Sequence, residues 1–266
     1  MQMIVGFTLA VLISWLAYRF RALDGSGFAA AVLLGGTVFS AGGLTWSVPL
    51  LVFFFSSSLW TRISARKTPR PPSREGKRGR SAQQVLANGG VALLSAASLW
   101  IHPQADWQWW CYLGSLAAVT ADTWATEIGP LLSGTTILIT TGKRVPPGTS
   151  GGVSIPGTLA SAAGAAVLAA LVSLPAAVNF QPLAFVFVLA AGLTGSLIDS
   201  LLGATVQRQA RCPACGKITD QPQDHPCQIS PDPFRGTPWI TNDSVNLICA
   251  AAGGTLALLL HSLWLS

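Results

Sequence analysis

The feature that most constrains this chain is a series of apolar segments, each long enough to cross a lipid bilayer. A bilayer core requires about 20 predominantly apolar residues per helix. Segments of this kind occupy residues 3–20, 27–43, 47–62, 85–101, 107–127, 153–174, 183–206 and 244–265. Only 10% of the residues are charged, whereas a soluble domain carries about 25%. The sequence therefore predicts an all-α, polytopic transmembrane bundle of about eight spans, with residues 1–266 forming a single domain.

The basic residues give this bundle a direction. Lys and Arg concentrate in short cytoplasmic loops, and all 16 of them fall on one side if the chain crosses the membrane eight times with both termini outside. Among the inner loops, 63–84 is basic and 207–243 is the longest. Membrane orientation thus explains the net charge of +6, and no nucleic-acid partner is predicted. The expected location is a bacterial inner (plasma) membrane or a thylakoid-like membrane, with the site facing the cytoplasm.

Carboxylates stand out at the cytoplasmic ends of three spans. Asp122 and Glu127 lie in ADTWATEIG, Asp199 lies within GSLIDSLLGA, and Asp243 opens the last span. Ionisable residues inside membrane segments are costly and usually face a bundle interior, a partner or a water-filled site. Asp243 could equally be an ordinary helix-end residue, whereas Asp199 lies well inside its span. Neighbouring hydroxyl residues extend this candidate site: Thr123, Thr126 and Ser200.

A glycine-rich loop, TTGKRVPPGTSGGVS, follows the fifth span on the same side. Lys143 and Arg144 supply positive charge, and glycine permits a backbone to approach a ligand closely. A helix expected to start near Val153 offers N-terminal amides that suit a phosphate. The loop alone could be a plain turn, but carboxylates at the same depth add ligands for Mg²⁺, as a nucleoside triphosphate requires. The candidate ligand residues of the loop are Gly148, Thr149, Ser150, Gly151, Gly152 and Ser154.

Side-chain amides complete the candidate site. Gln84 and Asn88 share a face at the start of the fourth span, and Asn242 and Asn246 flank Asp243. Asn242 could instead cap the last helix. An amide can bind a phosphate oxygen, a ribose or a base edge, and the sequence does not choose among these.

The loop 207–243 carries a cysteine and histidine pattern. CPACGKITDQPQDHPC places Cys212, Cys215, His225 and Cys227 with the spacing C-x2-C, nine residues, H-x-C. Three thiolates and one imidazole are typical of a closed, structural Zn²⁺ site. The loop is predicted to be cytosolic, where disulfides are rare. A reduced thiol pair or a redox C-x-x-C motif is the alternative.

Several of these motifs together resemble a known family. ADTWATEIG, KRVPPGTSGGVSIPG, GSLIDSLLGATVQ, the CPACGK…HPC segment and ITNDSVN resemble, in this order, the multi-span membrane proteins that include transmembrane protein 19 and plant phytyl-phosphate kinase. GRSAQQVLANGG is similar to the opening motif of that family. The resemblance implies phosphorylation of an isoprenyl monophosphate, such as phytyl phosphate, to its diphosphate, in a role similar to that of membrane polyprenol kinases that use CTP.

The residue chemistry agrees with that implication. Asp122 and Asp199 would hold Mg²⁺, and Lys143 and Arg144 would neutralise the transferring phosphates. Glu127 would be a further ligand or a neighbour of one. It lies five residues after Asp122, about 140° around an ideal helix, so the two point apart unless the helix bends or ends there. The expected partners are the lipid bilayer, a prenyl phosphate and a nucleoside triphosphate, with CTP as the expected donor.

Two other functions fit parts of the sequence. A transporter or flippase of an isoprenoid or other anionic lipid would place polar residues near the membrane midplane, but here they gather on the cytoplasmic side and the outer half looks inert. A structural protein that docks through a zinc-binding loop would explain the cysteines but not Asp199. His102 and His261, near the outer face, receive no role.

Overall fold

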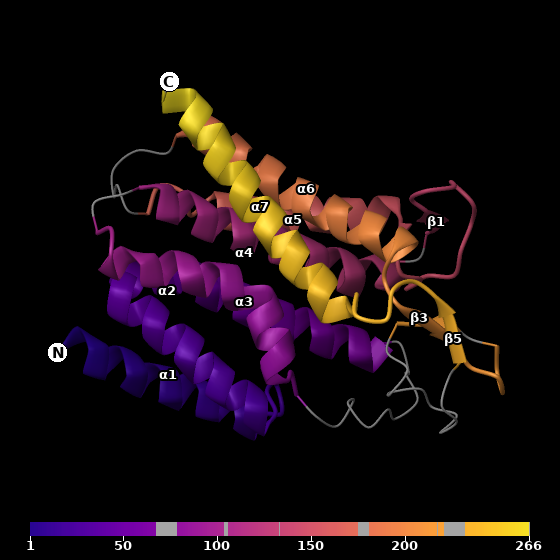
Figure 1. The fold of residues 1–266 in the computed structure, drawn as a ribbon, viewed down its shortest axis with the longest axis horizontal. Helices are drawn as coiled ribbons and strands as arrows, with labels where there is room; N and C mark the ends of the chain where they lie inside the picture. Colours follow the sequence, from indigo (N-terminus) through magenta and orange to yellow (C-terminus); the bar gives the residue numbers. More distant parts are fainter. Residues whose placement is uncertain are drawn as a thin grey trace.

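The computed structural model describes residues 1–67, 79–103, 106–132, 134–174, 181–216, 218–220 and 232–265. These residues form seven α-helices, two short 3₁₀ helices and five short strands. The helices lie side by side in a bundle. Both termini lie at one end of it, and the loops that carry β1, β3 and β5 lie at the other (Figure 1). We call these the terminal end and the loop end.

The helices coincide with the segments predicted from hydropathy. They are α1 (Gln2–Arg19), α2 (Gly25–Lys67), α3 (Ala82–Ala97), α4 (Trp107–Ile128), α5 (Ile155–Ala169), α6 (Pro182–Thr205) and α7 (Asn242–Leu265). Four of the described helices, α1, α2, α6 and α7, are long and apolar enough to cross a membrane by length and composition. The number of eight spans and the position of the termini outside the membrane stay predictions.

The segments 27–43 and 47–62 are the two arms of α2. The arms meet at Gly43, whose φ of 64° and ψ of −153° suit glycine and few other residues. Gln2 Nε2 donates to Phe39 O at 3.1 Å, beside the start of α1. Arg62 Nη2 donates to Phe20 O at 2.8 Å, just after the end of α1. The chain therefore reverses direction at Gly43.

The predicted loops 63–84 and 207–243 differ from the structure. α2 continues to Lys67 and α3 starts at Ala82, so both shorten the predicted loop 63–84. Ser81 starts α3 early because it forms a capping box with Gln84. The predicted loop 207–243 contains antiparallel strands, with β3 (Gln209–Arg211) between β4 (Ile218–Thr219) and β5 (Asp232–Arg235). A second pair, β1 (Ile137–Leu138) and β2 (Gly152–Val153), lies before α5. The fold is therefore mostly, but not purely, helical.

The central helix of the bundle is α4. It contacts α2, α3, α5, α6 and α7, and every residue from 112 to 122 is buried. Small residues allow this packing: a Cβ on Gly114 would lie 2.6 Å from Gly253 O, and a Cβ on Gly195 would lie 2.5 Å from Ala118 Cβ. Helices in a membrane associate largely by such close van der Waals contact.

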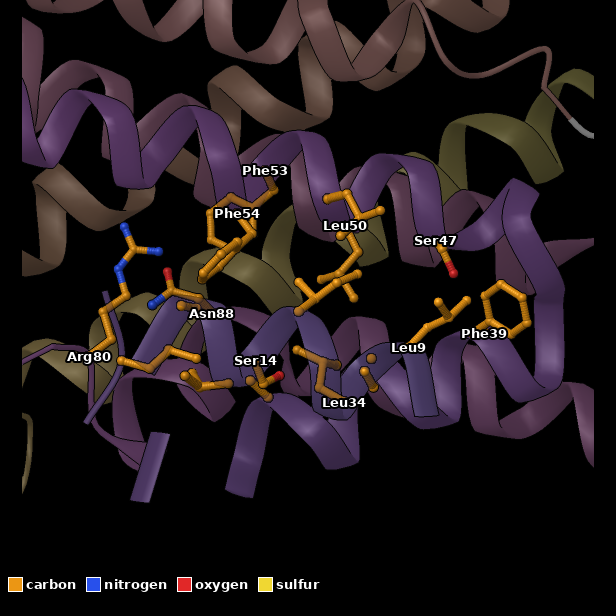
Figure 2. Close-up of a pocket in the computed structure, with 18 of the residues that line it drawn as sticks. Leu9, Ser14, Leu34, Phe39, Ser47, Leu50, Phe53, Phe54, Arg80 and Asn88 are labelled. Carbon is orange, nitrogen blue, oxygen red and sulfur yellow. The ribbon is translucent and has the colours of Figure 1, made fainter. Parts of the chain in front are cut away.

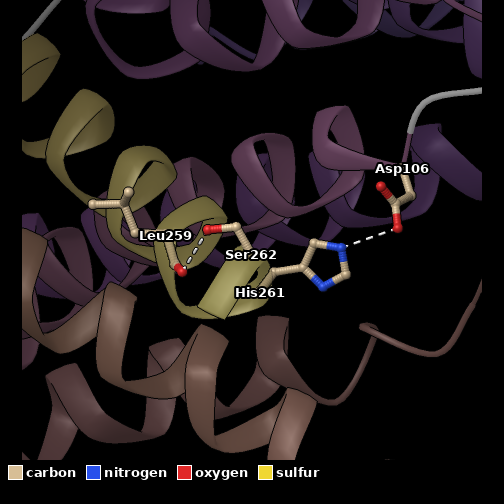
Figure 3. Close-up of polar contacts among 4 residues, drawn as sticks. All are labelled: Asp106, Leu259, His261 and Ser262. Carbon is tan, nitrogen blue, oxygen red and sulfur yellow. Dashed lines mark hydrogen bonds and ion pairs between the residues drawn. The ribbon is translucent and has the colours of Figure 1, made fainter. Parts of the chain in front are cut away.

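Polar side chains at the terminal end pair with one another. His261 Nε2 lies 3.0 Å from Asp106 Oδ2 (Figure 3), and the histidine ring stacks on Trp110 with the centroids 4.2 Å apart. Gln108 is fully buried and donates to His102 O at 2.7 Å. A polar contact therefore joins the start of α4 to the end of α7 at this end, and the expectation that this half has no functional role stays a prediction.

Candidate functional site

Asp122 and Asp199 come together toward the loop end of the bundle. Asp122 is buried near the end of α4, and Asp199 is half-buried on α6. Asp199 lies within electrostatic range of both Asp122 and Asp220, and we call these three residues the acidic cluster. Cys249 of α7 is buried within range of the same two helical carboxylates. Like charges at close range repel unless a cation or a proton reduces their charge.

Glycines on both sides of Asp199 allow this arrangement. Gly195, Asp199 and Gly203 recur every four residues and so share one face of α6. A Cβ on Gly203 would lie 2.7 Å from Ser150 Oγ, and Gly195 packs on α4 as described above. The close approach that the sequence predicts on this face is therefore used by neighbouring segments of the protein.

A buried glutamine joins three segments around the acidic cluster. Gln207 follows α6 and is 1% exposed. Its Oε1 accepts from Ser150 Oγ at 2.7 Å, and its Nε2 lies 3.3 Å from Asp220 Oδ2 and 3.4 Å from Asn242 Oδ1. Sequence reasoning missed Gln207 and Asp220. A lone amide directly after a span was the signal that could have indicated the glutamine.

The first turns of α7 form another wall of this region. Asn242, Asn246 and Cys249 follow one another at spacings of four and three, so they share a face. Cys249 places that face near the helical carboxylates. Thr241, rather than Asn242, caps the helix, because Thr241 Oγ1 accepts the N–H of Ser244 at 3.4 Å. Asn242 is therefore left to contact the buried glutamine.

The glycine-rich loop docks on α6 and exposes its basic residues. A Cβ on Gly151, whose φ is 78°, would lie 2.5 Å from Ala204 Cβ of α6, and Ser150 contacts the buried glutamine. Lys143 and Arg144 are exposed on the hairpin between β1 and β2. The structure therefore brings Ser150 to the acidic cluster but does not bring Lys143 or Arg144 to it.

Most hydroxyls predicted as ligands bond to nearby backbone. Ser154 caps α5 by accepting the N–H of Gly157 at 3.2 Å. Three threonines donate to carbonyl oxygens three or four residues earlier, at 2.7 to 3.0 Å: Thr123, Thr126 and Thr149. These hydroxyls already donate their one hydrogen within the fold. Among the remaining candidates, Gly148 faces open space, and Ser200 and Asp243 are half-buried.

Glu127 belongs to a second polar group on another face of α4. The helix continues to Ile128, so the five-residue spacing keeps Glu127 about 140° from Asp122. Thr61 Oγ1 donates to Glu127 Oε1 at 2.9 Å, while Glu127 Oε2 is buried without a hydrogen-bond partner among the described residues. Arg80 lies within electrostatic range; burial lowers the pKa of its guanidinium, and Glu127 opposes that shift. A metal shared by Asp122 and Glu127 does not fit this geometry.

Gln84 and Asn88 lie with this second group and not with the acidic cluster. Gln84 Oε1 accepts the N–H of Ser81 at 3.2 Å, and Asn88 Nδ2 donates to Gln84 O at 2.8 Å. Both residues, with Arg80, line an apolar cavity among α1, α2 and α3 (Figure 2). The predicted single site is therefore two groups on different sides of α4. Sequence reasoning also missed Arg80.

The carboxylate pair is compatible with Mg²⁺. Within the described ranges, no three His, Cys, Asp or Glu side chains form a metal-ligand group. Mg²⁺ is often bound through one or two carboxylates, with substrate phosphates and water completing its shell. Asp122 and Asp199 could supply this smaller protein contribution.

The cysteine motif forms a tight turn between β3 and β4. Gly216, whose φ is 71°, donates its N–H to Cys212 O at 2.9 Å. Cys212 is buried and Cys215 is exposed. His225 and Cys227 lie outside the described residues, so the four-ligand zinc site stays a prediction.

Comparisons with known proteins identify the family. No solved structure matches the chain. Protein PGR of Arabidopsis thaliana is 33% identical over 93% of this chain and 92% of that protein. The uncharacterized membrane protein MJ0933 of Methanocaldococcus jannaschii is 27% identical over 98% and 94%, and Protein VTE6, chloroplastic, of A. thaliana is 27% identical over 90% and 65%. The family profile described as integral membrane protein DUF92 matches residues 8–254, and the chain therefore belongs to this family of integral membrane proteins.

Proposed function

We propose that this protein is a membrane-embedded isoprenyl-phosphate kinase that transfers a phosphoryl group from a nucleoside triphosphate, CTP in this proposal, to a prenyl monophosphate. The observation that carries the proposal is the pairing of Asp122 and Asp199, from two helices, with Ser150 of the glycine-rich loop linked to the acidic cluster through Gln207 and Asp220. The resemblance to the family that includes plant phytyl-phosphate kinase supports the substrate class.

Asp122 and Asp199 would hold Mg²⁺ in this proposal, and the bound ion would neutralise charge on the nucleotide phosphates. A divalent cation would also remove the repulsion between the two carboxylates. Both residues belong to closely packed helices, so their positions are set before a substrate binds. Such preorganisation lowers the entropic cost of aligning the reactants.

The proposed reaction requires alignment more than acid–base chemistry. An oxygen of the prenyl phosphate, which is largely ionised at neutral pH because its second pKa is about 6, attacks the γ-phosphorus. The bond from that phosphorus to the β–γ bridging oxygen breaks, and the nucleoside diphosphate leaves with the electron pair. The products are a prenyl diphosphate and a nucleoside diphosphate. Gln207 would keep Ser150, Asp220 and Asn242 in a fixed relation around the nucleotide.

Turnover of defined substrates tests this proposal. The full-length protein in lipid nanodiscs should convert phytyl or geranylgeranyl phosphate to the diphosphate when Mg²⁺ and labelled CTP or ATP are present. A complete lack of product across a panel of prenyl phosphates and nucleotides would contradict it.

The alternative is a transporter or flippase of an isoprenoid or other anionic lipid. The apolar cavity, which reaches from Arg80 toward Ser47 along α2 (Figure 2), favours this alternative. It predicts movement of labelled prenyl phosphate across liposomes without nucleotide. Movement without nucleotide, together with a lack of diphosphate product, would select the transporter.

We also propose that Cys212 and Cys215, with His225 and Cys227, hold a structural Zn²⁺. The glycine-containing turn between antiparallel strands supports this proposal. The ion would stabilise the segment that carries Asp220 and thereby its contact with Gln207. Elemental analysis of protein purified without chelator should find about one zinc per chain, as a closed four-ligand site requires, and should find none in Cys212→Ser. Metal-free wild-type protein would refute the site.

A further inference from the structure

An apolar cavity lies among α1, the two arms of α2 and α3. Leu50 and Phe53 are among its mainly aliphatic and aromatic lining. Its two ends differ in polarity. Arg80 and Asn88 lie together at one end, and Phe39 lies at the other (Figure 2).

The backbone of Arg80 is fixed against the start of α2. Its N–H donates to Ala22 O at 3.0 Å, and its carbonyl accepts the N–H of Asp24 at 3.1 Å. A Cβ on Gly27 would lie 2.0 Å from Arg80 O, so only glycine permits this contact. The backbone of Arg80 is thus held in a defined position at the polar end of the cavity.

We propose that this cavity binds the hydrocarbon chain of a prenyl phosphate and that Arg80 binds its phosphate. The identity of the lipid rests on the proposed kinase function. The binding of a single-chain lipid with an anionic head rests on the cavity itself, which is apolar along its length and carries a guanidinium and amides at one end.

The head group is expected to decide selectivity. A hydrocarbon chain that leaves the bilayer for an apolar cavity exchanges one apolar environment for another, so burial alone gains little. A guanidinium offers planar, paired N–H donors that match phosphate oxygens. Glu127 lies within electrostatic range of Arg80 and offsets part of its charge. Hydrogen bonds from the nearby amides to the phosphate are therefore expected to contribute to binding.

The cavity and the acidic cluster lie on different sides of α4. Glu127 faces the Arg80 side, and Asp122 faces the acidic cluster. Five residues of helix separate the two by about 7.5 Å along the axis. A lipid phosphate beside Arg80 and a nucleotide beside Asp122 would therefore approach the last turn of α4 from different sides, and phosphoryl transfer would require the two phosphates to come together past the end of this helix.

Direct binding without nucleotide tests the head-group contact. The affinity of the protein in nanodiscs for geranylgeranyl phosphate is compared with that for geranylgeraniol, which lacks the phosphate. Arg80→Gln should weaken phosphate binding roughly 10- to 100-fold, as expected for a lost hydrogen bond to a charged group. Arg80→Lys should recover part of the affinity, and Arg66→Gln, at an exposed arginine, should change nothing. Equal affinities of wild type and Arg80→Gln would overturn the assignment.

Chain length tests the cavity. Gly35 lines it, and a Cβ there would lie 3.5 Å from Ala10 Cβ, which is an ordinary contact. Gly35→Leu should weaken binding of geranylgeranyl phosphate about tenfold, a loss of about 1.4 kcal/mol, and leave the shorter geranyl phosphate unaffected. Leu33→Met, at a half-exposed position of the same helix, is the matched control. Equal effects on both lipids, or a cavity that retains only bilayer phospholipid when prenyl phosphate is added, would contradict the inference.

These binding outcomes are separable from the kinase activity. Prenyl phosphate binding that responds to Arg80→Gln and Gly35→Leu, without any turnover, would support the cavity assignment and contradict the kinase. Turnover that neither substitution alters would support the kinase and overturn the cavity assignment.

Discussion

The two ends of the bundle hold their polar groups in opposite ways. At the terminal end, His261 pairs with Asp106, and the Tyr112 hydroxyl donates to Trp46 O. At the loop end, Asp122 and Asp199 are like charges within electrostatic range. Complementary polar contacts stabilise a fold, whereas juxtaposed like charges destabilise it. Violations of this kind are expected at functional sites, so we expect a ligand to bind at the loop end.

From this difference we expect substitutions at the two ends to affect different properties, turnover at the loop end and stability at the terminal end. Substitutions in the acidic cluster should change turnover more than unfolding. Substitutions in the terminal network should do the reverse.

The largest effect is expected for Asp122→Asn and Asp199→Asn. Each should lower kcat by roughly 10³-fold or more, because an electrostatic contact to the transferring group is lost. The unfolding temperature should stay the same or rise, since one of two repelling charges is removed. Diphosphate formation and thermal unfolding are measured on the same preparations, with Asp106→Asn as the control at the other end. Full turnover in Asp122→Asn would remove the basis of the comparison.

His261→Ala should give the opposite result. Loss of the Asp106 contact and of the stacking on Trp110 should reduce the free energy of unfolding by about 1 to 3 kcal/mol. The kcat/KM should stay within about twofold of wild type, because substitutions far from a site usually act independently of it. His261→Phe, which keeps an aromatic ring, should lie between the two proteins. A large loss of turnover without loss of stability would show that the terminal end takes part in function.

Gln207→Leu should have an intermediate effect on activity. Three polar partners lose their common contact, and at about 0.5 to 1.5 kcal/mol per hydrogen bond this should lower kcat/KM roughly tenfold to a few hundredfold. Gln83→Leu, at an exposed position of α3, is the matched control and should behave as wild type. If Gln207→Leu is fully active, the three segments do not need to be held together.

The smallest effect is expected for Lys143→Gln and Arg144→Gln. Both side chains are exposed, so their attraction to phosphate is screened, and turnover should fall only about two- to threefold, less in high salt. Steady-state rates at two ionic strengths would measure this. A loss as large as that of Asp122→Asn would mean that the hairpin closes over the nucleotide.

Local patterns predicted much of the architecture. Hydropathy placed each helix because length and polarity are local properties of a segment. Helical periodicity indicated that Glu127 and Asp122 point apart in a regular helix, but not that the helix stays regular, so Glu127 was wrongly grouped with Asp122 as a metal ligand. Membrane depth predicted that Asp122 and Asp199 meet. Membrane depth alone does not determine on which side of α4 a residue lies, so Gln84 and Asn88 were grouped with the wrong polar residues.

Contacts between distant segments were beyond these patterns. Gln207 joins residues that are 57 and 35 positions away in the chain, and no spacing rule links them. The strands of loop 207–243 are two to four residues long, and such short segments carry little periodicity. The position of Arg80 depends on backbone hydrogen bonds to residues just before α2, and its place in a basic loop does not predict them.

The central position of α4 has a consequence for biogenesis. α4 is not among the four described helices that are long and apolar enough to cross a membrane by themselves. Its polar residues, including Gln108 and Asp122, disfavour release from the translocon into lipid. The helices that cover most of its surface, α5, α6 and α7, leave the ribosome after it. We therefore expect α4 to stay near the translocon until these helices arrive, so that membrane insertion and tertiary packing of this chain proceed together.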